Sequence, residues 1–158
     1  MASEITLYNS LLKYIADGTV DLENDTIMLL LVTDDYVPAV THAALADVLT
    51  SPSPEVAEIA SPSNGYAQGG KELTGCEVSL VNSPLVSTWF ADNVIFQAFT
   101  ATFRYGVLYK SGEANGITDP LIAFILFDDA PDDVVVEGQD WTVRWNANGI
   151  LSFTLKAS

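Results

Sequence analysis

The spacing of hydrophobic residues changes along this chain from a helical period to a strand period. Near the N-terminus the apolar residues recur as on one face of a helix, at Ile5, Tyr8, Leu11, Leu12 and Ile15. Ser3 is suited to cap the free N–H groups of that helix, and Gly18 is suited to end it in the left-handed conformation. The pattern predicts an N-terminal helix over residues 3–17, docked on its own domain or on a neighbouring subunit.

The next segments predict one buried strand, one short helix and one loop. The continuous apolar run Ile27–Val32 is typical of a strand covered on both faces. We expect one face to meet an opposing sheet and the other to meet the N-terminal helix. The segment THAALADVL, residues 41–49, predicts a short helix capped by Thr41. The Ser/Pro-rich residues 51–64 predict a surface loop with room for one brief strand.

From Glu77 onward apolar and polar residues alternate with a period of two. The longest such run, Phe99–Tyr109, predicts one long half-buried strand with Phe99, Phe103 and Tyr105 on the same face. Shorter strands are predicted at Val86–Ala91, Val94–Phe96, Leu121–Phe127 and Val134–Val136. These roughly eight to ten strands are too many for one flat sheet.

The C-terminal apolar pattern predicts a hairpin. A three-residue loop over residues 147–149 would place Gly149 in the left-handed position of a bulged turn. It would give the pairs Trp145–Leu151, Val143–Phe153 and Trp141–Leu155, which keep the apolar residues on one face. The predicted fold is mainly β, a jelly-roll-like antiparallel β-sandwich with an N-terminal α-helix, in a single domain over residues 1–158.

The charge of the chain limits the classes of partner that it is expected to bind. Six Lys and Arg residues stand against 21 Asp and Glu residues, which gives a formal net charge of −15. The cations are scattered singly, at Lys13, Lys71, Arg104, Lys110, Arg144 and Lys156. Nucleic acid and anionic membranes are therefore not expected as partners. The acidic surface favours solubility and repulsion between copies, with a specific basic partner as the alternative.

One stretch, GYAQGGKE at residues 65–72, almost spells a phosphate-binding loop. A true loop of this kind follows a buried strand, opens a helix and carries Ser or Thr after the Lys. Here Glu72 takes the hydroxyl position and the following residues alternate like a strand. We interpret Gly65, Gly69 and Gly70 as bends that lead into a strand.

Few other residues are of types that take part in catalysis or metal binding. His42 is the only histidine and is interpreted as an exposed residue, and Cys76 is interpreted as a small buried hydrophobe. A Cys–His arrangement of these two residues is a minor alternative. The sequence therefore predicts no catalytic, cofactor-binding or metal-binding residues, no cofactor and no enzymatic activity.

Two further clusters leave alternatives open. The acidic segment DDAPDD is interpreted as a solvated turn, with calcium binding as the alternative, and contains Asp128, Asp129, Asp132 and Asp133. Trp141 and Trp145 fit a core, whereas Trp89 fits either the core or a sugar-stacking surface.

The N-terminal residues lack the basic and apolar regions of a signal peptide, and the run Ile27–Val32 is too short to cross a bilayer. We therefore expect synthesis in the cytoplasm and no membrane partner.

Several segments spread along the chain resemble a family of small virion proteins of tailed bacteriophages. They are LLKYIADGTVDLENDTIMLLLVT, GYAQGGKELTG, FTATFRYGVLYKSG, PLIAFILFDD and WTVRWNANGILSFTL. The resemblance implies an all-β protein of the phage particle and carries no functional residues across. It favours a capsid decoration, or cement, protein that lies on the capsid surface of the virion.

Such a protein would bind the major capsid protein and would form a homo-oligomer, a dimer or trimer. The alternatives are a tail, neck or connector component, or a glycan-binding module displayed on the virion.

Overall fold

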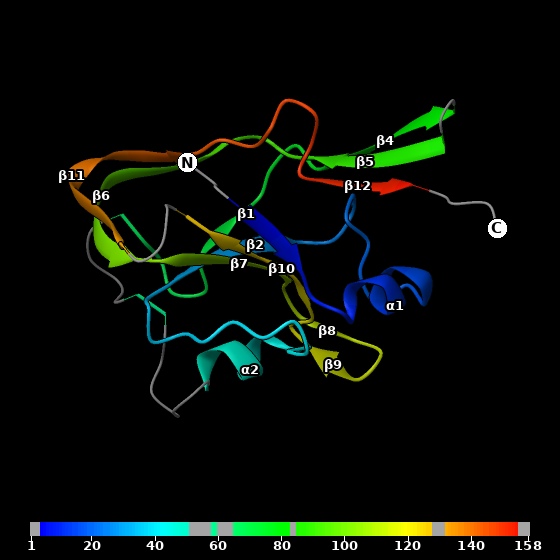
Figure 1. Cartoon of the computed structure of the whole chain (residues 1–158), viewed down its shortest axis with the longest axis horizontal. Coiled ribbons are helices and arrows are strands. Elements are labelled where there is room, and N and C mark those ends of the chain that lie inside the picture. Colours follow the sequence, from blue (N-terminus) through cyan, green and yellow to red (C-terminus); the bar gives the residue numbers. More distant parts are fainter. Residues whose placement is uncertain (1–3, 51–57, 60–64, 83–84, 128–131, 155–158) are drawn as a thin grey trace.

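The fold is mainly β, and every strand pairing among the described residues is antiparallel (Figure 1). The computed structural model describes residues 4–50, 58–59, 65–82, 85–127 and 132–154. The helices are α1 (Leu11–Ala16) and α2 (Leu45–Leu49). The strands are β1 (Glu4–Leu7), β2 (Ile27–Val32), β3 (Lys71–Glu72), β4 (Glu77–Asn82), β5 (Leu85–Phe90), β6 (Val94–Phe103), β7 (Tyr105–Lys110), β8 (Glu113–Ala114), β9 (Ile117–Thr118), β10 (Leu121–Leu126), β11 (Val134–Val143) and β12 (Leu151–Thr154).

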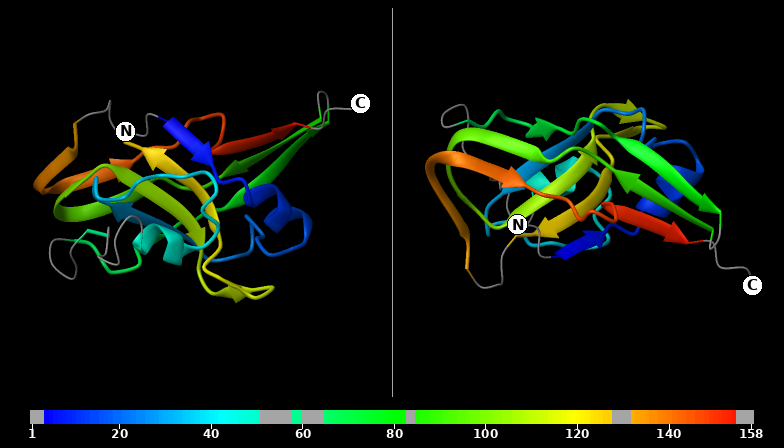
Figure 2. Two further views of the ribbon diagram at one scale, coloured as in Figure 1. Left: turned by 60° about the horizontal axis from the view of Figure 1, so that its bottom comes forward. Right: turned by 90° about the horizontal axis from the view of Figure 1, so that it is seen from above.

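The strands form two layers, as the sequence predicted. One layer is a five-stranded sheet in the order β1-β10-β7-β2-β3. The other consists of the β11–β6 ribbon and a three-stranded sheet in the order β12-β5-β4. Figures 1 and 2 show β4, β5 and β12 extending to one side of the molecule, beside α1. We call these three strands the arm. The mainly-β sandwich is confirmed, and the jelly-roll connectivity stays a prediction.

The main core lies between the two layers. Leu29 and Leu31 of β2 project into it from the five-stranded sheet, and Trp89, Phe99 and Phe103 project from the other layer. Its ring contacts are close, with the Phe103 and Trp141 centroids 4.7 Å apart. Burial of these large apolar side chains is the main stabilising contribution to such a fold.

The opposite face of the five-stranded sheet is also covered. Leu30 and Val32 of β2 pack there with Tyr36 and with Leu45 and Val48 of α2. The prediction that β2 is buried on both faces is therefore confirmed, but its second face meets α2 and not the N-terminal helix. The N-cap of α2 is Ala44, not Thr41, and the Asp47 carboxylate accepts the N–H groups of Ala43 and Ala44.

The N-terminal helix is shorter than predicted. Residues 4–7 form β1, which pairs with β10, and the helix covers only Leu11–Ala16. The predicted apolar stripe does not form one face, because Tyr8 packs in the second core whereas Leu11 packs in the first. Leu12, 66% exposed, packs in neither. Gly18 ends the turn after the helix with a positive φ of 76°, as predicted.

The predicted long strand Phe99–Tyr109 is two strands in two different sheets. It breaks at Arg104, between β6 and β7. The Arg104 N–H donates to the Val32 carbonyl, and its own carbonyl accepts the N–H of Phe127. The chain thus crosses from one layer to the other, so that Phe103 packs in the first core and Tyr105 against the second.

The predicted C-terminal hairpin is wrong. β12 pairs with β5, with Leu151 opposite Trp89, and β11 pairs with β6. Gly149 does have a positive φ of 98°, but it allows the chain to pass close to Thr88 of β5 instead of closing a hairpin with β11. Leu155 and most of residues 51–64 lie outside the described residues. In the described part of the chain, neither helix has the length and apolar character needed to cross a membrane.

Candidate functional site

The glycine-rich segment serves close packing. Gly70 has a φ of 92°, and a Cβ there would lie 2.1 Å from the Leu29 carbonyl oxygen of β2. β3 begins at the next residue, so the glycines are bends that lead into a strand, as predicted. The Gly69 N–H donates to the Glu58 carboxylate at 2.6 Å. A carboxylate of the chain therefore uses an amide that a phosphate-binding loop would offer to its ligand.

His42 and Cys76 adjoin different cores. His42 was predicted to be exposed, but it is half-buried, and its Nδ1 lies 3.1 Å from the Tyr36 hydroxyl. That hydroxyl lies 2.8 Å from the buried hydroxyl of Tyr8. Cys76 packs against the first core, and burial raises the pKa of its thiol. The two residues adjoin opposite faces of the five-stranded sheet, and the structure does not bring them together.

Trp89 is a core residue. It is 0% exposed and lies in β5 between Val78 of β4 and Leu151 of β12. The alternative that Trp89 stacks on a sugar is therefore wrong, because the indole has no accessible face.

The acidic segment DDAPDD is described only in part. Asp128 and Asp129 lie outside the described residues, and Asp132 is exposed. Asp133 accepts the Nε–H of Arg104 at 2.7 Å. Among the described residues, no group of three His, Cys, Asp or Glu side chains is placed to hold a metal ion.

An apolar groove lies at the root of the arm. One wall is formed by residues 15–23, which contribute Ile15, Val20 and Leu22, and the other by the face of the arm, which contributes Val78, Ser87 and Phe153. Its volume is about 490 Å³, within the size range of binding pockets in proteins. This groove is the candidate functional site.

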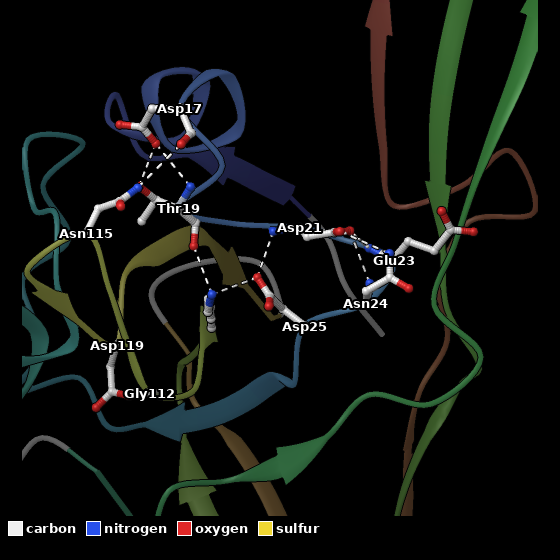
Figure 3. Close-up of polar contacts among 10 residues, drawn as sticks. Asp17, Thr19, Asp21, Glu23, Asn24, Asp25, Gly112, Asn115 and Asp119 are labelled. Carbon is white, nitrogen blue, oxygen red and sulfur yellow. Dashed lines mark hydrogen bonds and ion pairs between the residues drawn. The ribbon is translucent and has the colours of Figure 1, made fainter.

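The wall formed by residues 15–23 is held in place by hydrogen bonds from Lys110 and Asn115. Figure 3 shows Asn115 beside Thr19. Lys110 of β7 donates to the Asp25 carboxylate at 2.9 Å and to the Thr19 carbonyl at 3.0 Å. The Lys110 side chain is 13% exposed and the Asp25 side chain is 23% exposed, so the pair is largely shielded from water. The Asn115 amide, at the tip of the β8–β9 hairpin, donates to the Thr19 hydroxyl at 2.9 Å.

The start of this wall is fixed by Asp17. Its carboxylate accepts the Lys13 ammonium at 2.7 Å and both the N–H and the hydroxyl of Thr19. These hydrogen bonds lower the pKa of Asp17 to about 2, and the one from Lys13 has the largest effect. The residues that shape the groove are thus tied to α1, to β7 and to the β8–β9 hairpin.

Two carboxylates lie at the edge of the groove, on Asp21 and Glu23. The side-chain amide of Asn24 and two backbone N–H groups donate to Asp21 and lower the pKa of its carboxyl, so Asp21 is ionised near neutral pH. The Glu23 carboxylate makes no hydrogen bond or ion pair within the described residues. In Figure 3 it points away from the hydrogen-bonded loop, toward the strands of the arm.

The arm also leaves apolar side chains in water. Val78 is 37% exposed and Leu80 is 56% exposed, and they lie on the same face of β4 because they are two residues apart. In the strand register Leu80 lies across from Ser87, which lies across from Phe153 on its other side, and Ser87 and Phe153 both line the groove. Apolar residues gathered beside a groove often mark an interaction surface.

A second hollow, of about 350 Å³, lies between β1 and the loop that leads to β12. It is more polar than the groove and is lined by Glu4, Arg144, Trp145, Asn146, Asn148 and Ser152, among others. The Trp145 indole is held by a hydrogen bond from its Nε1–H to the Asp92 carbonyl at 2.9 Å.

Comparisons of the chain with protein-family models, with curated proteins and with solved structures find no match.

The sequence interpretation did not find the groove. The apolar residues of its two walls lie far apart in the chain, and only the pairing of β12 with β5 brings Phe153 next to Ser87. One signal was present. The segment DGTVDLEND places Val20 and Leu22 among acidic residues between a helix and a strand, and both side chains are buried in the main core beside the groove.

Proposed function

We propose that this chain is a structural protein of a tailed-bacteriophage particle. In this proposal it decorates the capsid, binds the major capsid protein and stabilises the shell without catalysing a reaction. It acts on the capsid surface as a homo-oligomer, a dimer or trimer. The proposal combines the resemblance of the sequence segments with an exposed apolar surface beside a groove.

The observation that carries the proposal is the arm and its groove. A chain with a net charge of −15 exposes Val78 and Leu80 next to a groove lined by Ile15, Val20 and Phe153. Apolar side chains in such a setting gain free energy when a partner removes them from water, at about 25 cal/mol per Å² of buried apolar surface. Many copies bound to a symmetric shell would add multivalency to a modest single contact.

The polar groups near the groove support a role in binding and not in chemistry. Asp17, Asp25 and Lys110 are each engaged in hydrogen bonds that fix the wall of the groove. The only histidine lies elsewhere and is engaged with Tyr36. The groove thus offers shape and apolar surface, with the carboxylates of Asp21 and Glu23 at its edge.

The number of copies per particle tests this function. Purified particles would be analysed by quantitative mass spectrometry, with the major capsid protein as the internal reference. Decoration predicts hundreds of copies that remain bound through purification. A handful of copies would favour the tail, neck or connector alternative, and absence from the particle would contradict both.

A second candidate function, glycan binding, is favoured by the hollow at Trp145 and not by Trp89. Glu4, Arg144 and Asn146 offer hydrogen-bonding groups beside the fixed indole, a combination suited to sugar hydroxyls and ring faces. Binding to a glycan array that is lost in Trp145→Ala and kept in Trp141→Phe would support it. The absence of any glycan-dependent signal would rule out glycan binding.

A further inference from the structure

We propose that the groove binds a segment of another protein in which apolar side chains are flanked by Lys or Arg. The proposal deepens the proposed function, because it states the chemistry of the partner segment that the arm would contact. It rests on three features of the groove: its apolar walls, its acidic edge and its fixed geometry.

The walls set the apolar part of the ligand. Val20 and Leu22 face the groove from one side, and Val78 and Phe153 face it from the other. Val20 and Leu22 are already buried in the main core, at 2% and 6% exposed, and form the closed side of the groove. The apolar surface that a ligand can remove from water is mainly that of Val78, 37% exposed, and of the half-buried Phe153. A groove of about 490 Å³ is large enough for side chains and not for a folded domain.

The edge sets the charged part of the ligand. Asp21 and Glu23 lie at the groove, and the Glu23 carboxylate has no partner within the described residues. The net charge of the whole chain has the same sign, at −15. A segment with Lys or Arg beside its apolar residues would pair with Glu23 and would associate faster in this field, whereas an acidic segment would be repelled.

The geometry makes the site ready for a ligand. Lys110 and Asn115 hold Thr19 in place, and Asp17 fixes the turn at Gly18. A wall that is already fixed loses little conformational freedom on binding, and this favours affinity.

A second copy of this chain is a poor occupant. The closest pair of its six cations, Arg104 and Lys110, is six positions apart (110 − 104 = 6), and both lie in ion pairs. Lys13 pairs with Asp17, and Lys71 donates to the Ile95 carbonyl. Lys13 is exposed beside Leu12 but is engaged by Asp17, and Arg144 is a single exposed cation next to the buried Val143. The main obstacle to a second copy is the charge, because two copies at −15 each repel one another.

The test selects short random peptides on the immobilised full chain and then measures the affinity of the enriched peptides by fluorescence polarisation. Two variants change the groove, Val78→Ser and Glu23→Lys. Two matched controls make the same changes at exposed strand positions elsewhere, Val135→Ser and Glu137→Lys in β11. Thermal unfolding of all four variants confirms that each is folded.

The proposal predicts enriched peptides that combine apolar residues with Lys or Arg. Val78→Ser should weaken their binding by about tenfold, and Glu23→Lys by about threefold with a reduced dependence on salt. The two controls should change binding by less than about twofold. Binding that is indifferent to Val78, peptides rich in Asp and Glu, or no enrichment would each contradict the proposal. So would self-association that Val78→Ser abolishes.

This test can fail or succeed independently of the proposed function. If basic peptides bind in the groove but the copy number per particle is low, the proposed binding site is supported and capsid decoration is rejected. If the copy number is high and the Val78→Ser variant stays fully attached to particles, capsid decoration is supported and the proposed role of the groove is rejected.

Discussion

The ammonium group of Lys110 lies 2.9 Å from the Asp25 carboxylate and 3.0 Å from the Thr19 carbonyl. This contact joins β7, in the middle of the five-stranded sheet, to the segment that forms one wall of the groove. The shape of the groove therefore depends on an ion pair that lies outside it.

Replacing Lys110 should test this dependence. Lys110→Met leaves the shielded Asp25 carboxylate without its cation, and we expect the free energy of unfolding to fall by about 2 kcal/mol. Urea unfolding measures the effect, and binding of groove-selected peptides should weaken in the same variant. Lys13→Met is the matched control, because its ion pair with Asp17 is exposed and should contribute less than about 1 kcal/mol. Equal losses in the two variants would contradict this account.

The glycine-rich segment makes a second prediction. Gly70→Ala combines a positive φ with a Cβ only 2.1 Å from the Leu29 carbonyl oxygen, so we expect a loss of about 3 kcal/mol or more. Gly112→Ala has a similar φ of 97° with open space around the added Cβ, and should cost about 1 kcal/mol. If Gly70 served a nucleotide instead, Gly70→Ala would leave stability intact and change nucleotide binding.

The buried pair of Tyr8 and Tyr36 leads to a third prediction. Tyr36→Phe removes the hydroxyl that lies 2.8 Å from the Tyr8 hydroxyl, and leaves that buried group without its partner. We expect a loss of about 1–3 kcal/mol in urea unfolding. Tyr105→Phe, which keeps the ring contact with Tyr36, should lose less than about 0.5 kcal/mol. A neutral Tyr36→Phe would show that the two hydroxyls do not stabilise the fold.

Alkaline pH should destabilise the protein. Burial, and then the negative charges of Asp119 and Glu58, raise the pKa of Tyr109 to about 12. Burial also raises the pKa of Tyr8 and Tyr66. The tyrosines of the unfolded chain titrate near pH 10, so above that pH the unfolded state loses protons that the folded state keeps.

The stabilisation that the protonated hydroxyl of Tyr109 provides is therefore complete below about pH 10 and is lost as the pH rises through about 12. Urea midpoints measured across this range should fall, and the absorbance of tyrosinate should rise together with unfolding. A midpoint that stays constant while tyrosinate forms would contradict the burial of these hydroxyls.

The sequence predicted the parts of the fold that depend on local pattern. The uninterrupted apolar run of β2 required cover on both faces, and the structure supplies it. The strands of the second half were found because alternation with a period of two fixes which residues face the core.

The sequence did not predict which strands pair. Leu151 and Phe153 have the alternation that a hairpin with β11 would need, but the same alternation suits β5, and β5 is the partner. Tertiary contacts also override helical spacing at Ile5, which pairs with Ile125 of β10. The groove was missed for this reason, since its walls meet only once the partner of β12 is known.

The most direct test of the central claim is a cryo-electron microscopy map of the intact particle that contains this chain. The account predicts density for the chain at repeated positions over the capsid surface, with the arm against the major capsid protein and a Lys- or Arg-bearing segment in the groove beside Val78 and Glu23. Density restricted to the tail or a single vertex, or a groove open to solvent in every bound copy, would contradict it.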